Sequence, residues 1–263
     1  MSAQTADHHS IIDAMTANAA RSTLPYQQAH RGTDFGTAFW FNDLVDTQGD
    51  TETVRQYLVT ARALTRYDVA EVRLRPELSK SAMSANALAL LAFEDGWIPL
   101  GDSGVAVMSA APLHALARRK RWEWATDEIT DGLAAKEQDV AGIGDEPVPA
   151  YVLGHDVGPD RTDRPQAVVV GTVVRDAADG PVWWNGTVPV GCVGAPVFVG
   201  IHLDGRRFRL VCLGVILPED GSRHPVATFD RIRSAVRKLP EPPSPPASDD
   251  PAPRSRRWWR RAG

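Results

Sequence analysis

The stretch Gly191-Cys192-Val193-Gly194-Ala195-Pro196-Val197-Phe198 is the most informative segment of this chain of 263 residues. Its glycines permit a tight turn in which backbone N–H groups converge on one point. The apolar run that starts at Val197 suits a β-strand directly after the turn. Any tight turn that enters a strand could share these features, so the meaning of the stretch depends on the segments around it.

Three further informative segments of the chain precede this stretch. The first is Phe35–Phe41 with Tyr57–Leu64 (FGTAFWF and YLVTARAL), the second is Gly96–Val107 (GWIPLGDSGVAV), and the third is Gly144–Gly154 (GDEPVPAYVLG) with Val168–Val173 after it. Together with GCVGAP they resemble the strands and the G-x-S-G-G-P nucleophile turn of bacterial trypsin-like serine peptidases. The resemblance covers residues 33 to 237 and implies a two-barrel fold.

The same resemblance implies that the catalytic triad is vacant. The general-base histidine falls on Ala63, the aspartate that orients it falls on Gly104, and the nucleophilic serine falls on Val193. Alanine and glycine cannot accept or relay a proton, and valine carries no nucleophilic atom. We therefore expect a catalytically inactive homologue, a pseudoprotease, whose oxyanion loop consists of Gly191, Cys192, Val193, Gly194 and Ala195.

Cys192 supports an alternative hypothesis, an active endopeptidase with a cysteine nucleophile or with catalytic residues outside the alignment. A cysteine nucleophile needs a partner that generates the thiolate, usually histidine. The segment YLVTARAL contains none, which leaves His155 and His202 as the histidines that folding could bring near the second barrel. A small buried cysteine is the structural alternative. Asp102 lies two residues before the vacant acid position and would face the same side of an extended segment, or be an exposed turn carboxylate.

Composition and patterning predict an all-β fold of two packed six-stranded antiparallel β-barrels, followed by a C-terminal helix and a disordered tail. Hydrophobic residues make up 43% of the chain and charged residues 24%, enough for one large core or two barrels. Short apolar segments separated by Gly, Pro, Asn and Asp are typical of strands. The expected strands are Gly36–Phe41, Tyr57–Ala61, Val69–Arg75, Ala87–Phe93, Val105–Met108, Val148–Leu153, Ala167–Val174, Pro196–Ile201 and Phe208–Ile216.

Two helices are expected, one near each end. Ser10 can cap a short amphipathic helix that carries Ile11, Ile12, Met15 and Ala19 on one face, and Thr228–Leu239 has apolar residues at helical spacing. The predicted domains are an N-terminal extension (1–32), the double-barrel domain (33–239) and the tail (240–263). Residues 110–142 are predicted to connect the barrels, with Trp122 and Trp124 packed on them; nucleic-acid binding by their basic run is disfavoured.

The C-terminal tail has its own composition. Seven of the 14 residues from Pro240 to Pro253 are proline, which predicts an extended spacer that cannot bury a core. The end of the tail is basic and aromatic, and carries Arg256, Arg257, Trp258, Trp259, Arg260 and Arg261. Arginine is attracted to anionic headgroups and tryptophan prefers the membrane interface, so an anionic membrane surface or an acidic partner is expected. Nucleic acid and the absence of any partner are the remaining alternatives.

Other features bear on the compartment and on cofactors. No apolar run reaches the 18 or more residues of a transmembrane helix, and the N-terminal residues lack the pattern of a signal peptide. Cys192 and Cys212 are the only cysteines, which favours a reducing cytoplasm, with a peripheral membrane location through the tail as an option. No cofactor and no metal are expected.

The function expected from these observations is a binding or regulatory module that holds a peptide or protein in the former substrate cleft without cutting it. The Trp183-Trp184 pair lies just before the vacant nucleophile loop, where it could line a ligand cleft or be buried at a strand edge. A third hypothesis is a structural remnant whose function lies in the tail.

Overall fold

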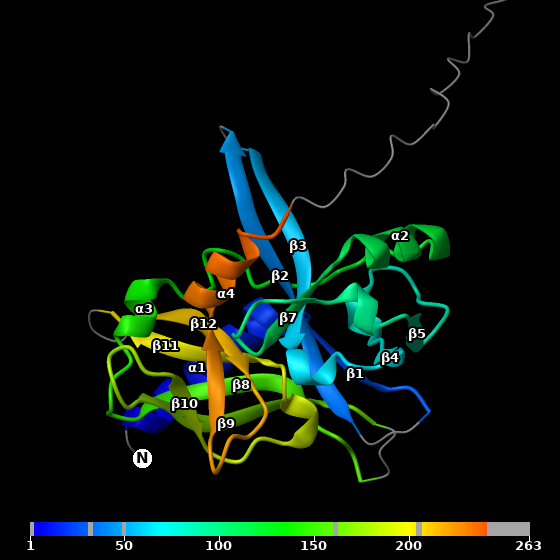
Figure 1. The fold of residues 1–263 in the computed structure, drawn as a ribbon. Coiled ribbons are helices and arrows are strands. Elements are labelled where there is room, and N and C mark those ends of the chain that lie inside the picture. Colours follow the sequence, from blue (N-terminus) through cyan, green and yellow to red (C-terminus); the bar gives the residue numbers. More distant parts are fainter. Residues whose placement is uncertain (1–2, 31–33, 49–50, 160–162, 204–206, 241–263) are drawn as a thin grey trace, which may run out of the picture.

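The computed structural model describes residues 3–30, 34–48, 51–159, 163–203 and 207–240. They form two antiparallel β units with few helices, so the predicted all-β class with two β units is confirmed (Figure 1). The predicted disordered tail, with Arg256, Arg257, Trp258, Trp259, Arg260 and Arg261, lies outside the described residues.

The first β unit is a seven-stranded sheet in the order β5-β4-β1-β2-β3-β7-β6, which does not close on itself. The sequence predicted six strands in a barrel. Here the sheet gains β1, whose residues fall in the predicted N-terminal extension, and the two-residue β6. Its strands are β1 (Thr23–Gln28), β2 (Phe35–Gln48), β3 (Thr51–Ala61), β4 (Val69–Arg73), β5 (Ala87–Leu91), β6 (Ile98–Pro99) and β7 (Val105–Ser109).

The second β unit is a closed six-stranded barrel in the order β10-β13-β12-β11-β8-β9. Two of its strands, β10 and β13, are short and were not predicted individually, while the predicted Phe208–Ile216 coincides with β12. The strands are β8 (Val148–His155), β9 (Gln166–Arg175), β10 (Val182–Asn185), β11 (Pro196–His202), β12 (Phe208–Ile216) and β13 (His224–Thr228).

Strand β2 shows how the two units share one interface. Side chains alternate across a strand, and here both faces are buried. Phe39 and Phe41 belong to the core that contains the barrel, whereas Trp40 belongs to the core of the open sheet. Strand β7 shows the same pattern, with Val107 in the core that contains the barrel and Ala106 in the core of the open sheet. The sheet therefore contributes one face to its own core and the other to the junction with the barrel.

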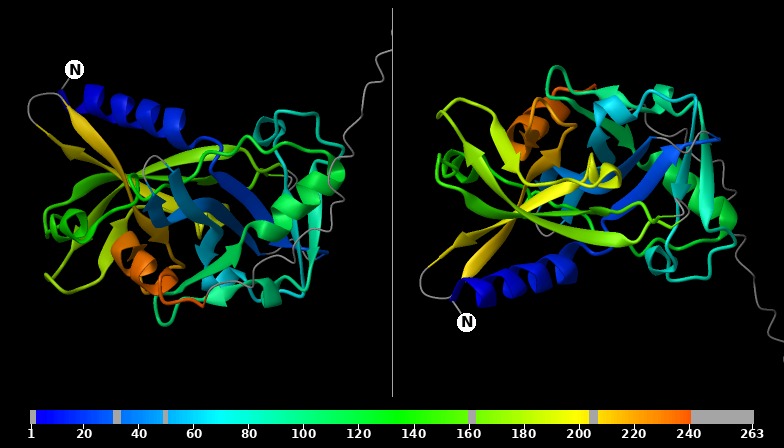
Figure 2. Two further views of the ribbon diagram at one scale, coloured as in Figure 1. Left: turned by 90° about the horizontal axis from the view of Figure 1, so that it is seen from above. Right: turned by 90° about the horizontal axis from the view of Figure 1, so that it is seen from below.

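The helices cover the outside of the β units (Figure 2). Helix α1 (Ala3–Ala19) buries Ile11, Met15 and Ala19 against the barrel, as predicted. The expected cap at Ser10 is wrong, because the helix starts upstream and Ser10 lies inside it. Helix α4 (Phe229–Val236) lies within the predicted Thr228–Leu239, with Thr228 at the N-cap position.

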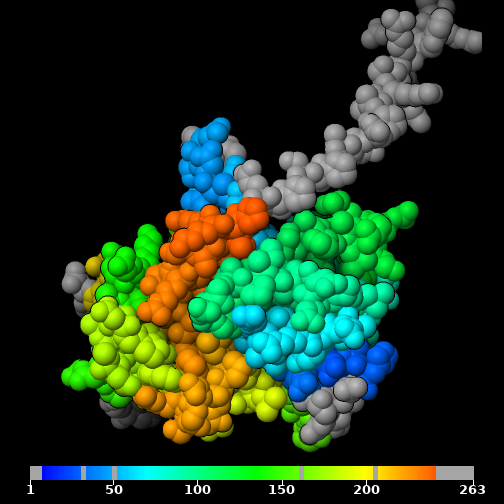
Figure 3. All heavy atoms as spheres, viewed as in Figure 1, coloured from blue at the N-terminus to red at the C-terminus, as the bar shows by residue number. Residues whose placement is uncertain are grey.

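The connection between the units contains α2 (Ala111–Lys120) and α3 (Glu137–Ala141). The expected packing of its tryptophans is confirmed, since Trp122 belongs to the core of the open sheet and the half-buried Trp124 packs against that core. The β2–β3 hairpin stands out from the rest of the surface (Figure 3). Its outer part is exposed, including Val45 and Val54.

Candidate functional site

The positions predicted for the general base and the acid lie side by side. Ala63 is exposed in the single 3₁₀ turn η1 (Arg62–Leu64), which directly follows β3. The backbone N–H of Arg62 donates to the carbonyl oxygen of Gly104 at 2.8 Å. Strand β3 pairs with β7 up to Ala61 opposite Val105, so the register of two neighbouring strands holds the two positions together.

The position predicted for the nucleophile reaches the same junction from the barrel. Val193 ends the 3₁₀ turn η4 (Val190–Cys192), and its carbonyl oxygen accepts from the N–H of Thr37 in β2 at 3.0 Å. The next residue, Gly194, has φ +88°, and a Cβ there would overlap Thr60 Oγ1 of β3. Glycine is required because the barrel loop touches the backbone of the open sheet at this point. Ala63, Gly104 and Val193 thus all lie where the two units meet.

No residue at these three positions can carry out the chemistry of a triad. Gly104 has φ +76°, and a Cβ at Gly104 would lie 2.8 Å from a terminal methyl of Leu217, the residue after β12. A carboxylate side chain would therefore need both a rare backbone conformation and the displacement of an apolar side chain. The space into which a Cβ of Gly104 would extend is thus taken up by the side chain of Leu217.

The amides of the oxyanion loop are already used inside the protein. The N–H groups of Cys192, Val193 and Ala195 donate within the loop itself, to Pro189 O at 2.8 Å, Val190 O at 3.3 Å and Cys192 O at 3.1 Å. The N–H of Gly194 donates to Ile216 O in β12 at 2.9 Å. An oxyanion hole needs converging donors with no other partner. In this conformation the loop offers no such set among these four amides.

Cys192 is buried, and its thiol is free rather than bridged to Cys212. Burial raises the pKa of the Cys192 thiol to about 12, so the thiolate is scarce near neutral pH. Cysteine nucleophiles sit in the opposite environment, electropositive and accessible. The geometry favours the small buried cysteine over the nucleophile hypothesis.

Neither histidine considered from the sequence is placed to activate this thiol. His155 is buried, its Nε2 lies 2.9 Å from Thr23 Oγ1, and its Nδ1 lies 3.1 Å from the carbonyl oxygen of Arg164. Burial lowers the pKa of His155 to about 4, so the ring is neutral. His202 is exposed at the end of β11, six residues along the strand from Pro196 beside the loop.

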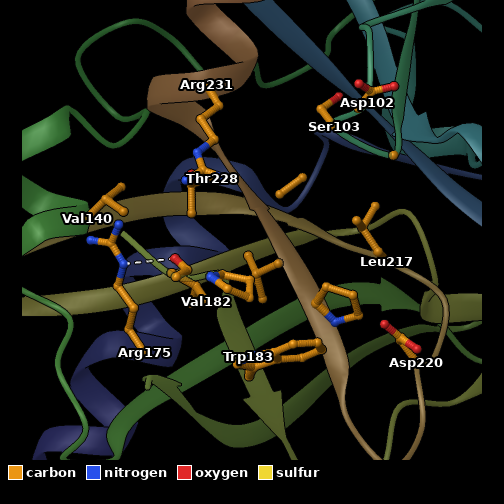
Figure 4. A pocket seen from close by; sticks show the side chains of 16 residues that line it. Asp102, Ser103, Val140, Arg175, Val182, Trp183, Leu217, Asp220, Thr228 and Arg231 are labelled. Carbon is orange, nitrogen blue, oxygen red and sulfur yellow. Dashed lines mark hydrogen bonds between the residues drawn. The ribbon is translucent and has the colours of Figure 1, made fainter. Parts of the chain in front are cut away.

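A cavity of about 430 Å³ begins at the vacant acid position and extends over the face of the barrel (Figure 4). It is apolar near Leu217 and Trp183 and polar at its rim, where Arg175 and Arg231 come from β9 and α4. Asp102, exposed on the loop before Gly104, also lines it. Trp183 lines the cavity, whereas Trp184 is buried in the core of the closed barrel rather than at a strand edge.

The interactions in the cavity rim keep its side chains in place. The guanidinium of Arg223 lies over the ring of Trp183 at 4.6 Å, and Asp176 also binds that guanidinium, at 2.9 Å. Arg175 Nε donates to the carbonyl oxygen of Gly180 at 3.0 Å. The sequence did not indicate Arg175, Arg231 or Leu217 as site residues, because no motif links these separate segments.

A metal site and a membrane-spanning helix are both absent from the part of the chain that the structure describes. It contains no group of three His, Cys, Asp or Glu side chains that could hold a metal ion. In the same residues, no helix combines the length and the apolar character needed to cross a bilayer.

Comparison with known proteins gave structural neighbours only. No family model matches the chain, and no curated protein matches it in sequence. Among solved structures, it is similar to a serine endoprotease from Yersinia pestis, with 8% identity, a TM-score of 0.49, and coverage of 86% of this chain and 66% of that one. It is also similar to a catalytically inactive tobacco etch virus protease complexed with substrate, with 8% identity, a TM-score of 0.48 and 85% of both chains covered.

Proposed function

We propose that this chain is a trypsin-like protease homologue without peptidase activity, which binds an extended peptide or protein segment at the junction of its two β units. The hydrogen bond from Arg62 N–H to Gly104 O carries the proposal, because it supports the alignment that assigns Ala63 and Gly104 to the triad. The contacts of Val193 and Gly194 with β2 and β3 bring the nucleophile position to the same place. On this proposal the three positions correspond to those of a triad, and their residues lack its chemistry.

The proposed ligand site is the 430 Å³ cavity beside Gly104. An apolar floor with a few polar groups at the rim is typical of sites that bind small or extended ligands. Trp183 provides an aromatic face, and Arg175, Arg231 and Asp102 provide charges at the mouth. A bound segment would be held without being cut, since Ala63, Gly104 and Val193 provide neither the nucleophile nor the general base of a triad.

Intact-mass spectrometry tests the absence of an active nucleophile. The protein is treated with a fluorophosphonate and, separately, with a peptide chloromethyl ketone, and adducts are mapped. We expect no labelling of the folded protein. Cys192→Ser and Val193→Ser serve as matched variants, and neither should gain labelling, because the loop amides stay engaged. Rapid stoichiometric labelling of the wild type at Cys192 or at any serine would overturn the proposal.

Binding is tested with a pool of random decapeptides passed over immobilised protein. Trp183→Ala and Leu217→Asp should reduce the retained peptide at least tenfold, because they change the apolar part of the cavity. Val170→Asp is the control, since Val170 is 51% exposed on β9 and does not line the cavity. Equal retention by all variants, or peptide cleavage by the wild type, would count against a binding module.

The alternative of an active cysteine hydrolase makes a different prediction. It requires the buried Cys192 thiol and the neutral His155 ring to become accessible together. Hydrolysis of a casein substrate that disappears in Cys192→Ser would favour it.

A role for the tail remains a separate proposal. Its arginines and tryptophans would bind an anionic membrane surface or an acidic partner, from a cytoplasmic location, and the interaction should weaken with salt. Co-sedimentation with vesicles that contain phosphatidylserine distinguishes the full chain from a truncation that ends at Leu239. Equal sedimentation of the two would contradict the membrane proposal.

A further inference from the structure

Strand β5 is an open end of the first β unit. Within the described residues it pairs only with β4, and it lies at the outer side of the molecule in Figure 1. The other end of the sheet, β6, has two residues, one of which is Pro99. A very short strand with proline resists further pairing, whereas a five-residue strand without proline does not.

The register of β5 identifies which of its backbone groups are free. Leu74 N–H donates to Asn86 O at 2.8 Å, and the carbonyl oxygen of Val69, opposite Leu91, instead accepts from Ala29 at 3.0 Å on the β1 side. Hydrogen-bonded and non-bonded pairs alternate along an antiparallel ladder. The N–H and C=O groups of Ala87, Ala89 and Leu91 therefore point away from β4.

The edge has none of the charges that usually prevent pairing. Residues 81 to 93 contain no charged side chain. The Leu91 side chain is 76% exposed, and Leu88 and Leu90 pack inward on the core of the sheet. An apolar cavity of about 260 Å³ lies at the C-terminal end of β5. Its lining includes Leu90, Leu91, Phe93 and Met108. An exposed, uncharged and apolar edge of this kind can template the addition of another strand.

We propose that β5 pairs with β5 of a second copy of this chain, antiparallel and about a two-fold axis at Ala89. In this register Ala89 faces the partner subunit's Ala89, and Leu91 faces the partner subunit's Ala87. The exposed Leu91 thus lies opposite a small side chain, the core-facing Leu88 lies opposite the partner subunit's Leu90, and no like charges meet. The same patch is used twice, which is the property of a two-fold interface.

Self-complementarity is the reason to assign a second copy rather than another protein. The free groups at residues 87, 89 and 91 are symmetric about Ala89, so two copies can satisfy one another completely. The same register carries the partner's residues before Ala87 over the 260 Å³ cavity. This inference does not depend on the proposed function, because β5 is remote from the vacant triad positions in the strand order.

A disulfide at the two-fold axis tests the register directly. Hydrogen-bonded antiparallel partners have Cα atoms about 5.5 Å apart, within the range that a disulfide spans. The full-length Ala89→Cys variant should form a covalent dimer under mild oxidation. Both native cysteines are buried and free, so they do not compete. Val170→Cys is the matched control, because Val170 is exposed on the closed barrel, which has no free edge. Cross-linking no faster at Ala89 than at Val170 would overturn the proposal.

Sedimentation equilibrium of the unmodified chain is the second measurement. We expect a concentration-dependent dimer whose dissociation constant rises at least tenfold in Ala89→Lys and is unchanged in Val170→Lys, with unchanged circular dichroism. A monomer at all concentrations contradicts self-pairing. If that monomer's β5 amides gain exchange protection with a random decapeptide pool, the edge belongs to a different protein.

Discussion

The two β units of this molecule use the same kind of strand and reach opposite results at their edges. In the barrel every strand has two neighbours, from β10 round to β9, so no backbone edge is left. The first sheet stays open between β5 and β6 and keeps two ends. The two proposed interaction surfaces follow this difference: one is the free edge of the open sheet, and the other is the junction where the loops of the barrel touch that sheet.

The strongest test of this comparison removes one large core side chain from each unit. Trp184 in the barrel and Trp40 in the sheet are both fully buried, and the indole N–H of each lacks a hydrogen-bond partner among the described residues. Truncation of tryptophan to alanine costs about 3–5 kcal/mol, and more where the surroundings cannot collapse. The closed ring of hydrogen-bonded strands restrains the barrel, so it can collapse less around a lost side chain. The loss of unfolding free energy should therefore be near the upper value for Trp184→Ala and near the lower value for Trp40→Ala. Urea unfolding gives both values, and a larger loss for Trp40→Ala would refute the argument.

The second test targets the contact between the units. Gly194→Ala should cost about 3 kcal/mol of unfolding free energy, from a positive φ and from overlap with Thr60 in β3. Gly101→Ala is the control. It also has positive φ, at +55°, but nothing lies within 4 Å of its added methyl, so it should cost about 1 kcal/mol. Equal losses in chemical denaturation would mean that the barrel loop does not pack tightly on the sheet.

The third test uses pH, since His155 of the barrel contacts Thr23 of the sheet. Burial lowers the pKa of His155 to about 4 from an ordinary value of 6.5. The unfolded chain binds this proton more tightly than the folded chain. The contribution of neutral His155 to the unfolding free energy is therefore complete above about pH 6.5 and is lost as the pH falls toward 4. The total is about 3 kcal/mol. His155→Gln should flatten this dependence of the unfolding free energy, and His202→Gln, at an exposed position, should not. If the unfolding free energy of His155→Gln depends on pH as steeply as that of the wild type, the dependence arises from other titratable groups.

The smallest expected effect is at the open edge itself. Leu91 and Val170 are both exposed, at 76% and 51%, so Leu91→Ser and Val170→Ser should each change the unfolding free energy of the monomer by less than about 0.5 kcal/mol. The measurement is made at concentrations too low for self-association. A clearly larger loss at Leu91 would show that β5 packs more closely than its exposure indicates.

Much of the strand content could be predicted from local pattern. The segments that became β2, β3, β11 and β12 alternate or run apolar between turn residues, and packing did not override that preference. The short β10 and β13 could not be predicted individually, because they contain only four and five residues. Strand β1 was placed in an extension, since its pairing with β2 and β4 depends on contacts distant in the sequence.

By itself, the sequence determined the all-β class, the helix that follows β13 and the identity of the residues at the three presumed triad positions, because these depend on local propensity and on residue chemistry. Only the tertiary structure decided that Ala63, Gly104 and Val193 meet at one junction, that Leu217 fills the space beside Gly104, and that the first unit stays open at β5. Closure of a sheet and approach of distant loops depend on the register and twist of all the strands together, and no single segment encodes them.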